Sequence, residues 1–88
     1  MSRHAMPWAF PGFTAREVDT GLEVTAVVPD MFAHKAGLAP GDLLMTLGGA
    51  PVFTQLDLQA MLRVFKPGEP LKVGWVRESE LLESEAQL

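Results

Sequence analysis

Hydrophobic and polar residues follow a strand-like pattern in two neighbouring stretches near the start of the chain. The stretch 13–18 is compatible with a strand, and residues 19–21 are typical of a turn. The stretch 22–28 alternates apolar and polar residues at its start and is then continuously apolar. It is rich in β-branched residues and bounded by Gly21 and Pro29, as strands often are. The pattern therefore predicts an antiparallel hairpin.

The next segment predicts a short helix, a tight turn and a third strand. Asp30 is expected to cap a helix that runs through about residue 36. Gly37 supplies the left-handed residue that ends a helix without a Cβ clash. Residues 40 and 41, a Pro-Gly pair, suit the central positions of a type II turn. The apolar stretch 43–47 then predicts a strand.

The strongest local signal is the start of a second helix at Thr54. A tight turn at Gly48-Gly49 and a very short strand over 51–53 precede it. Thr54 and Asp57 have the spacing of a capping box in its acidic form. Helical spacing then places four apolar residues on one face, namely Leu58, Met61, Leu62 and Phe65. The Lys66-Pro67-Gly68 sequence ends this helix.

Two further strands complete the prediction. Residues 71–77 alternate, with Val73 and Trp75 facing inward, and 81–88 forms a weaker, Glu-rich final strand. Residues 1–9 show no period and are expected to be a tail or linker before a single domain over 10–88. Two helices against a small antiparallel sheet define an α+β fold.

Composition and charge limit the classes of function that are open to this chain. The 88 residues suffice for one small core, and 48% of them are hydrophobic. The net charge of −4, with seven scattered Lys and Arg residues, argues against nucleic-acid binding and a basic membrane surface. Cysteine is absent, and no apolar run reaches transmembrane length. We expect no cofactor and no direct membrane insertion.

No constellation in the chain predicts catalysis or metal binding. The two histidines, His4 and His34, have no second ligand at zinc spacing and no His-Glu-x-x-His run around them. The serines lie in terminal or polar stretches without a nucleophile elbow. Asp42 is interpreted as a residue of the turn and strand start. The residues therefore argue against an enzyme in its own right.

The motifs along 10–88 resemble those of a PDZ domain. The resemblance rests on the stretch 21–29, on Ala-Gly-Leu-x-Pro-Gly-Asp over 36–42, and on Lys-Pro-Gly-Glu over 66–69. The bacterial kind is favoured, as in high-temperature-requirement serine proteases, site-2 metalloproteases and carboxyl-terminal processing proteases. The ending over 77–81 also resembles the module that closes glycyl aminopeptidases.

The resemblance implies both an architecture and a parent protein. The architecture is a small antiparallel sheet or partly open barrel of five to six strands capped by two helices, in which the C-terminal strand replaces the N-terminal strand of animal PDZ domains. The parent would be a bacterial protease or peptidase, extracytoplasmic or membrane-associated, whose catalytic domain is a partner of this module.

The implied function is peptide binding by strand addition. A C-terminal or extended peptide would lie between the first strand and the second helix, its carboxylate held by backbone N–H groups. Phe10, Phe13 and Leu62 would form a pocket for an apolar last side chain. Carried over by position, the binding residues are Phe10, Gly12, Phe13, Thr14, Ala15, Gln55, Gln59 and Leu62.

Three departures from the family pattern keep an alternative open. Pro11 has no N–H where the animal pattern has a donor, so only Gly12 and Phe13 remain for the carboxylate. Gln55 stands where one animal class has a hydroxyl-reading histidine, and Phe32 stands where the family usually has proline. The alternative is a regulatory or scaffold module, with a closed groove, that binds no free peptide.

Overall fold

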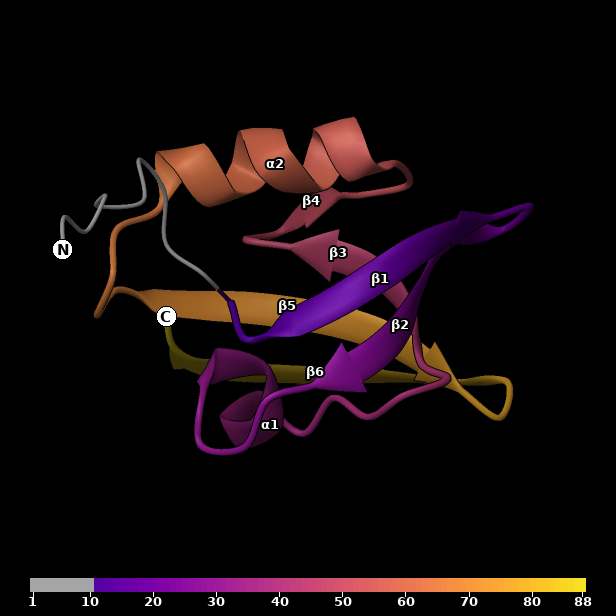
Figure 1. Ribbon diagram of the computed structural model, residues 1–88, viewed down its shortest axis with the longest axis horizontal. Helices are drawn as coiled ribbons and strands as arrows, with labels where there is room; N and C mark the ends of the chain where they lie inside the picture. The colour runs from indigo at the N-terminus through magenta and orange to yellow at the C-terminus, as the bar shows by residue number, and fades with distance from the viewer. Residues whose placement is uncertain (1–10) are drawn as a thin grey trace, which may run out of the picture.

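The computed structural model describes residues 11–88 and shows a six-stranded antiparallel sheet with two helices (Figure 1). In chain order the elements are β1 (Phe13–Val18), β2 (Gly21–Val27), α1 (Phe32–Ala36), β3 (Leu43–Leu47), β4 (Ala50–Pro51), α2 (Gln55–Val64), β5 (Pro70–Arg77) and β6 (Glu80–Gln87). The α+β prediction is therefore confirmed. The predicted tail at 1–9 and the pocket residue Phe10 lie outside the described residues.

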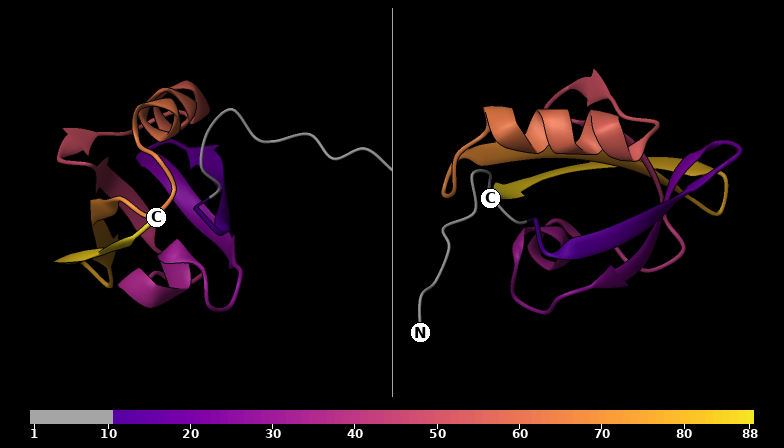
Figure 2. Two further views of the ribbon diagram at one scale, coloured as in Figure 1. Left: turned by 90° about the vertical axis from the view of Figure 1, so that its left-hand side faces the viewer. Right: turned by 45° about the horizontal axis from the view of Figure 1, so that its top comes forward.

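The sheet is open and does not close into a barrel. Its strand order is β1-β2-β3-β5-β6, with the short β4 paired to β3 off this path, so β1 and β6 are its two edges. The two helices lie on opposite sides of the molecule, α2 above β1 and α1 below it in the view of Figure 1. The end-on view in Figure 2 shows the same arrangement. One edge of the sheet thus lies beside α2.

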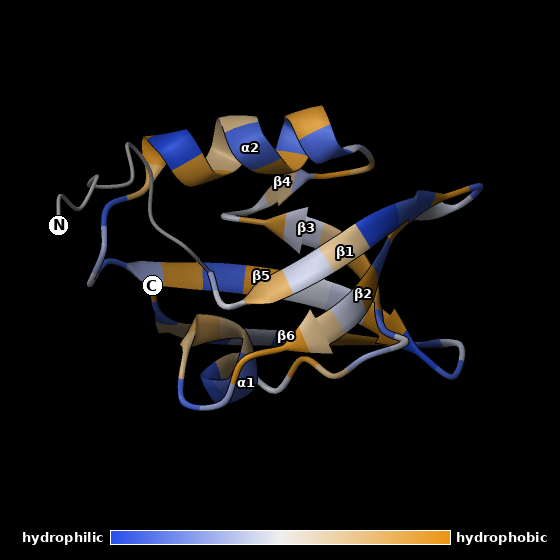
Figure 3. Cartoon of the chain, viewed as in Figure 1, coloured by the Kyte–Doolittle hydropathy of each residue, from blue (hydrophilic) through white to orange (hydrophobic). Residues whose placement is uncertain are grey.

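The core occupies the space between the sheet and the helices. Apolar and polar positions are interspersed along α2 (Figure 3), and its buried residues, Leu58 and Leu62, belong to the core. The inward positions predicted for β5 are confirmed, because Val73 and Trp75 are 1% and 4% exposed. The largest fully buried apolar side chains of the described residues are Leu22, Val24, Leu44, Leu47, Val52, Leu71 and Val73. Strand alternation and helical spacing therefore converge on one core.

The predicted end of the first helix at Gly37 and the predicted turn after it are confirmed. Gly37 has a φ of 103° and ends α1, and Gly41 has a φ of 95° in the following turn. The N–H of Asp42 closes this turn by donating to the carbonyl of Ala39 at 3.1 Å, the bond expected between its first and last residues. The turn therefore directs the chain straight into β3.

The prediction that Asp30 caps α1 is wrong. The residue before the first turn is Met31, whose side chain makes no capping bond, and Asp30 has a left-handed φ of 67°. The N–H of Asp30 donates to Nδ1 of His34 at 3.0 Å. The N–H of Ala33 donates instead to the carbonyl of Pro11, at 3.0 Å. A distant backbone carbonyl therefore does what a capping side chain was expected to do.

The capping box at the start of α2 is confirmed. The N–H of Asp57 donates to Oγ1 of Thr54 at 3.1 Å, and the N–H groups of Phe53 and Thr54 donate to Oδ2 of Asp57 at 2.9 and 3.2 Å. These bonds lower the pKa of Asp57 below its ordinary value of 3.8, the bond from Phe53 contributing most.

We expect Asp57→Asn to lose a pH-dependent part of the domain's stability. A carboxyl whose pKa is lowered on folding stabilises the folded state above its unfolded pKa, and this contribution disappears as pH falls through the folded value. The two proteins should therefore differ most near neutral pH and converge below pH 3.8. Urea unfolding of both at a series of pH values measures this. A difference that is constant with pH would contradict the assignment.

Candidate functional site: the free edge of β1 beside α2

The candidate site consists of the turn before β1, the outer edge of β1, and α2. Among residues 11–88, β1 pairs with β2 alone, so one row of its backbone N–H and C=O groups points away from the sheet. In an antiparallel pair these groups point alternately toward the partner strand and away from it. The carbonyl of Gly12 accepts from the N–H of Val28 at 2.8 Å and therefore faces β2. Phe13 and Ala15 consequently present their backbone groups to the free edge.

The turn at Pro11 and Gly12 directs two N–H groups outward. A trans peptide unit holds its C=O and its N–H on opposite sides, and the described chain contains no cis peptide. The carbonyl of Pro11 accepts from Ala33 at 3.0 Å, so the N–H of Gly12 points away from α1. The carbonyl of Gly12 accepts from Val28, so the N–H of Phe13 points away from β2. The same bonds that anchor the turn thus orient its donors.

Close packing against Met31 fixes the position of this turn. Gly12 has a φ of 80°, in the region that favours glycine. A Cβ atom on Gly12 would lie 2.4 Å from the Cβ of Met31. Pro11, Gly12 and Phe13 are all buried. Glycine is therefore required here both by the backbone conformation and by the available space.

Five of the predicted site residues lie at three places in the structure. Phe13 and Leu62 are 4% and 5% exposed and belong to the core. Ala15 and Gln55 lie at the edge itself, where Nε2 of Gln55 donates to the carbonyl of Ala15 at 2.5 Å. Gln59 is exposed on α2, one turn beyond Gln55.

Thr14 is the predicted residue that the structure does not bring to the free edge. Its backbone faces β2 by the strand alternation. Its hydroxyl lies 2.8 Å from that of Thr25, across the β1–β2 pair, where both residues are exposed. Its side chain therefore lies away from the groups that Phe13 and Ala15 present.

Glu17 is a residue of this edge that the sequence did not single out. Its Oε2 accepts from the backbone N–H of Gln55, the first residue of α2, at 2.9 Å. The two residues are 38 positions apart, and no local motif links them. Together with the Gln55–Ala15 bond, this contact joins the start of α2 to the far end of β1.

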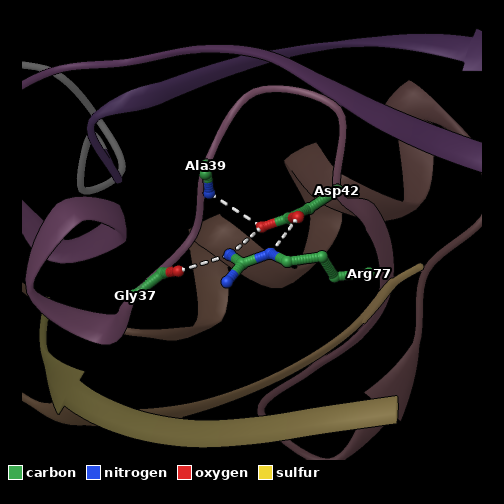
Figure 4. A network of polar contacts seen from close by, with 4 residues as sticks. All are labelled: Gly37, Ala39, Asp42 and Arg77. Carbon is green, nitrogen blue, oxygen red and sulfur yellow. Dashed lines mark hydrogen bonds and ion pairs between the residues drawn. The ribbon is translucent and has the colours of Figure 1, made fainter. Parts of the chain in front are cut away.

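Away from the edge, the one buried charged side chain of the described residues is Asp42, 2% exposed. Arg77 donates to both of its carboxylate oxygens, at 2.8 and 2.7 Å, and to the carbonyl of Gly37 at 2.8 Å (Figure 4). Oδ2 of Asp42 also accepts from the N–H of Ala39 at 2.7 Å. The bond to Asp42 raises the pKa of Arg77. This network ties the last turn of α1 to β5 and is a structural element, as the interpretation of Asp42 required.

The described residues contain no group of three or more His, Cys, Asp and Glu side chains placed to hold a metal ion. Within the same part of the chain, no helix is long and apolar enough to cross a membrane. The free edge of β1 carries hydrogen-bonding groups of the backbone and of Gln55.

A helix thus flanks the free edge of a strand in a small open sheet. The chain belongs to the PDZ domain family, because the family model for the PDZ domain matches residues 11–88. The resemblance seen in the motifs is confirmed.

The relatives in sequence are proteases that are much longer than this chain. HhoB, a candidate serine protease of Synechocystis, is 44% identical over 64% of this chain and 14% of its own length. The periplasmic pH-dependent serine endoprotease DegQ of Escherichia coli is 32% identical over 82% of this chain and 16% of its own. A candidate zinc metalloprotease of Rhizobium meliloti is 37% identical over 68% of this chain and 16% of its own. The chain thus spans about a sixth or less of each.

Solved structures share the fold. The HtrA-type protease AlgW with a decapeptide superposes with a TM-score of 0.85, at 17% identity over 91% of this chain and 28% of that one. The HtrA3 PDZ domain bound to the phage-derived ligand FGRWV has a TM-score of 0.73, at 22% identity over 89% of this chain and 82% of that one. An aminopeptidase N family protein of Idiomarina loihiensis has a TM-score of 0.79, at 26% identity over 88% and 13%.

Proposed function

We propose that the domain binds an extended peptide by adding it as a strand to the free edge of β1, beside α2. The observation that carries this proposal is the orientation of the backbone. Phe13 and Ala15 offer N–H and C=O groups with strand spacing, and no strand of the described chain pairs with that edge. An extended peptide satisfies such groups and is recognised in this way by other domains.

We further propose that the peptide's C-terminal carboxylate lies against the N–H groups of Gly12 and Phe13. Both N–H groups point away from the elements that hold their carbonyls. Consecutive outward N–H groups beside a left-handed residue form a concave anion site. An apolar last side chain would lie over an apolar floor made by Phe13 and Leu62. Two solved structures of the same fold, AlgW with a decapeptide and the HtrA3 PDZ domain with FGRWV, support peptide binding as such.

In the parent protein, this non-catalytic module would present substrate segments to a protease domain or regulate it. The relatives are proteases, and several of them are periplasmic by name, which supports an extracytoplasmic location.

We expect pentapeptides with an apolar last residue, FGRWV among them, to bind the isotope-labelled domain at millimolar concentration or below. Amide resonances of Gly12, Phe13 and Gln59 should shift on titration. Replacing the terminal carboxylate by an amide should weaken binding about tenfold or more, because a charge-assisted hydrogen bond contributes about 1.5–3 kcal/mol.

Two results would contradict parts of this proposal. If no pentapeptide shifts any resonance at millimolar concentration, the domain is not a free-peptide binder and the alternative of a closed module stands. If amidated and free peptides bind equally, strand addition survives and the carboxylate site does not. A library with varied last residues tests the apolar floor in the same experiment.

A further inference from the structure

One hydrogen-bonding group of the proposed peptide edge already has a partner within the domain. The carbonyl of Ala15 is one of the two acceptors, with that of Phe13, that an added strand would need from this part of β1. Nε2 of Gln55 donates to it at 2.5 Å. A side-chain carboxamide has the same N–H and C=O groups as a peptide unit. Gln55 therefore occupies the place of one backbone N–H of the incoming peptide.

A second contact holds Gln55 in this position. Its own backbone N–H, one of the four that α2 cannot satisfy internally, donates to Oε2 of Glu17 at 2.9 Å. Glu17 lies two residues beyond Ala15 on the same strand. Gln55 is thus bound to β1 by both its backbone and its side chain, and it is partly buried there.

We infer that Gln55, held by Glu17, is an intramolecular latch that closes the far end of the peptide groove. This inference rests on the proposed function. It adds that a side chain of the domain competes with the peptide for the carbonyl of Ala15. A peptide whose last residue lies opposite Phe13 places its third residue from the end opposite Ala15, because backbone groups repeat every two residues along a strand. The last two residues enter an open edge. The third residue pairs with β1 only after it displaces the carboxamide of Gln55.

The latch predicts that peptide length has little effect on affinity until Gln55 is removed. In the wild type, the N–H of the third peptide residue replaces Nε2 of Gln55 as the donor to the carbonyl of Ala15, so the number of hydrogen bonds does not change. In Gln55→Ala the carbonyl of Ala15 is free to accept, so FGRWV should bind about 3- to 10-fold more tightly, the range of one net hydrogen bond. The dipeptide WV does not reach Ala15, and its affinity should not change. Alanine is well tolerated at the first position of a helix.

The experiment compares four proteins with both peptides by calorimetry and resonance shifts. Besides the wild type and Gln55→Ala they are Glu17→Ala, which removes the second contact, and Gln87→Ala. The last is a matched glutamine on β6, at the opposite edge of the sheet. Glu17→Ala should strengthen FGRWV binding less than Gln55→Ala does, and Gln87→Ala should leave it unchanged.

A measurement without peptide tests the latch independently. The side-chain amide resonances of Gln55 should show a hydrogen-bond coupling to the carbonyl of Ala15, and that carbonyl resonance should move in Gln55→Ala. If FGRWV binds the wild type and Gln55→Ala equally, or if the coupling is absent, the latch is overturned while the proposed function stands. If neither protein binds any pentapeptide, the proposed function fails and the latch fails with it, because removing the Gln55 side chain does not open the edge. Binding by Gln55→Ala alone would contradict peptide binding by the wild type and would identify Gln55 as a permanent closure.

Discussion

Gly12→Ala is expected to destabilise the domain by about 2–5 kcal/mol. Two effects add. An alanine held in the left-handed region is strained by about 1–2 kcal/mol, and φ at this residue is 80°. Overpacking a well-filled site contributes about 1–3 kcal/mol more, because the new Cβ would lie 2.4 Å from the Cβ of Met31. The contact is with an atom next to the backbone, so a rotamer change cannot relieve it.

Gly49→Ala is the matched control for this prediction. Gly49 has a φ of 85°, and a Cβ there would meet nothing within 4 Å. Gly49→Ala should therefore be destabilised only by the backbone strain of the left-handed region, about 1–2 kcal/mol. Urea unfolding of the wild type and both variants measures the difference. For a domain of this size each kcal/mol also lowers the Tm by about 4–8 °C.

The neighbour of Gly12 provides a further check. Met31→Ala keeps the Cβ atom and should not rescue Gly12→Ala, whereas Met31→Gly in the same background should recover part of the steric loss. Equal destabilisation by Gly12→Ala and Gly49→Ala would show that the space around Gly12 is not limiting. Peptide binding should fall together with stability at Gly12, because the backbone shift also moves the outward N–H of Phe13.

The sequence predicted those parts of the fold whose cause is local. The capping box joins Thr54 to Asp57 three residues away, and the turn before Asp42 closes over three residues. The strands 13–18 and 43–47 agree with the observed bounds. In each case the side chains that determine the backbone lie within one turn or one strand of it.

The parts that the sequence did not predict depend on partners far away in the chain. Aspartate is a preferred N-cap residue, so Asp30 was predicted to cap α1. The N–H of Ala33 instead donates to the carbonyl of Pro11, so no capping side chain is needed. The bond from Gln55 to Ala15 spans 40 residues. Family resemblance placed both residues in the groove, and it could not show that each already satisfies the other.

The same distinction separates the fold from the site. Apolar periodicity specifies which faces are buried, and burial accounts for the sheet and both helices. The proposed binding edge depends instead on which way individual peptide units point, and those orientations are set by the bonds from Ala33 and Val28. The family resemblance pointed to the N–H groups of Gly12 and Phe13, but backbone groups carry no residue signature, so their orientation could not be predicted from the residue pattern.

Asp42→Ala is expected to destabilise the domain by about 2–3 kcal/mol. The carboxylate is 2% exposed and accepts from Arg77 and from the N–H of Ala39. Hydrogen bonds to a charged group contribute about 1.5–3 kcal/mol, and removing one partner of a buried ion pair is more damaging still. The loss is moderated because Arg77 is 39% exposed and remains solvated without its partner.

Arg77→Ala should destabilise more than Asp42→Ala, because it leaves the buried carboxylate without a counter-charge. Arg77 also stabilises by donating to the carbonyl of Gly37 and by lying 5.9 Å from the centroid of the Trp75 ring. Arg77→Lys keeps the charge, but a single ammonium group does not reproduce the planar fork that bonds both Asp42 and Gly37. Lysine should therefore restore only part of the stability.

A double-mutant cycle measured by urea unfolding tests the Asp42–Arg77 pair. Once Asp42 is replaced, Arg77 has no buried charge left to neutralise, so the double variant should lose less stability than the two single variants together. Additive losses, or a smaller loss for Arg77→Ala than for Asp42→Ala, would contradict this account. The pair connects the end of α1 with β5, on residues separate from the edge of β1. Arg77→Lys, if still folded, should accordingly bind FGRWV as the wild type does.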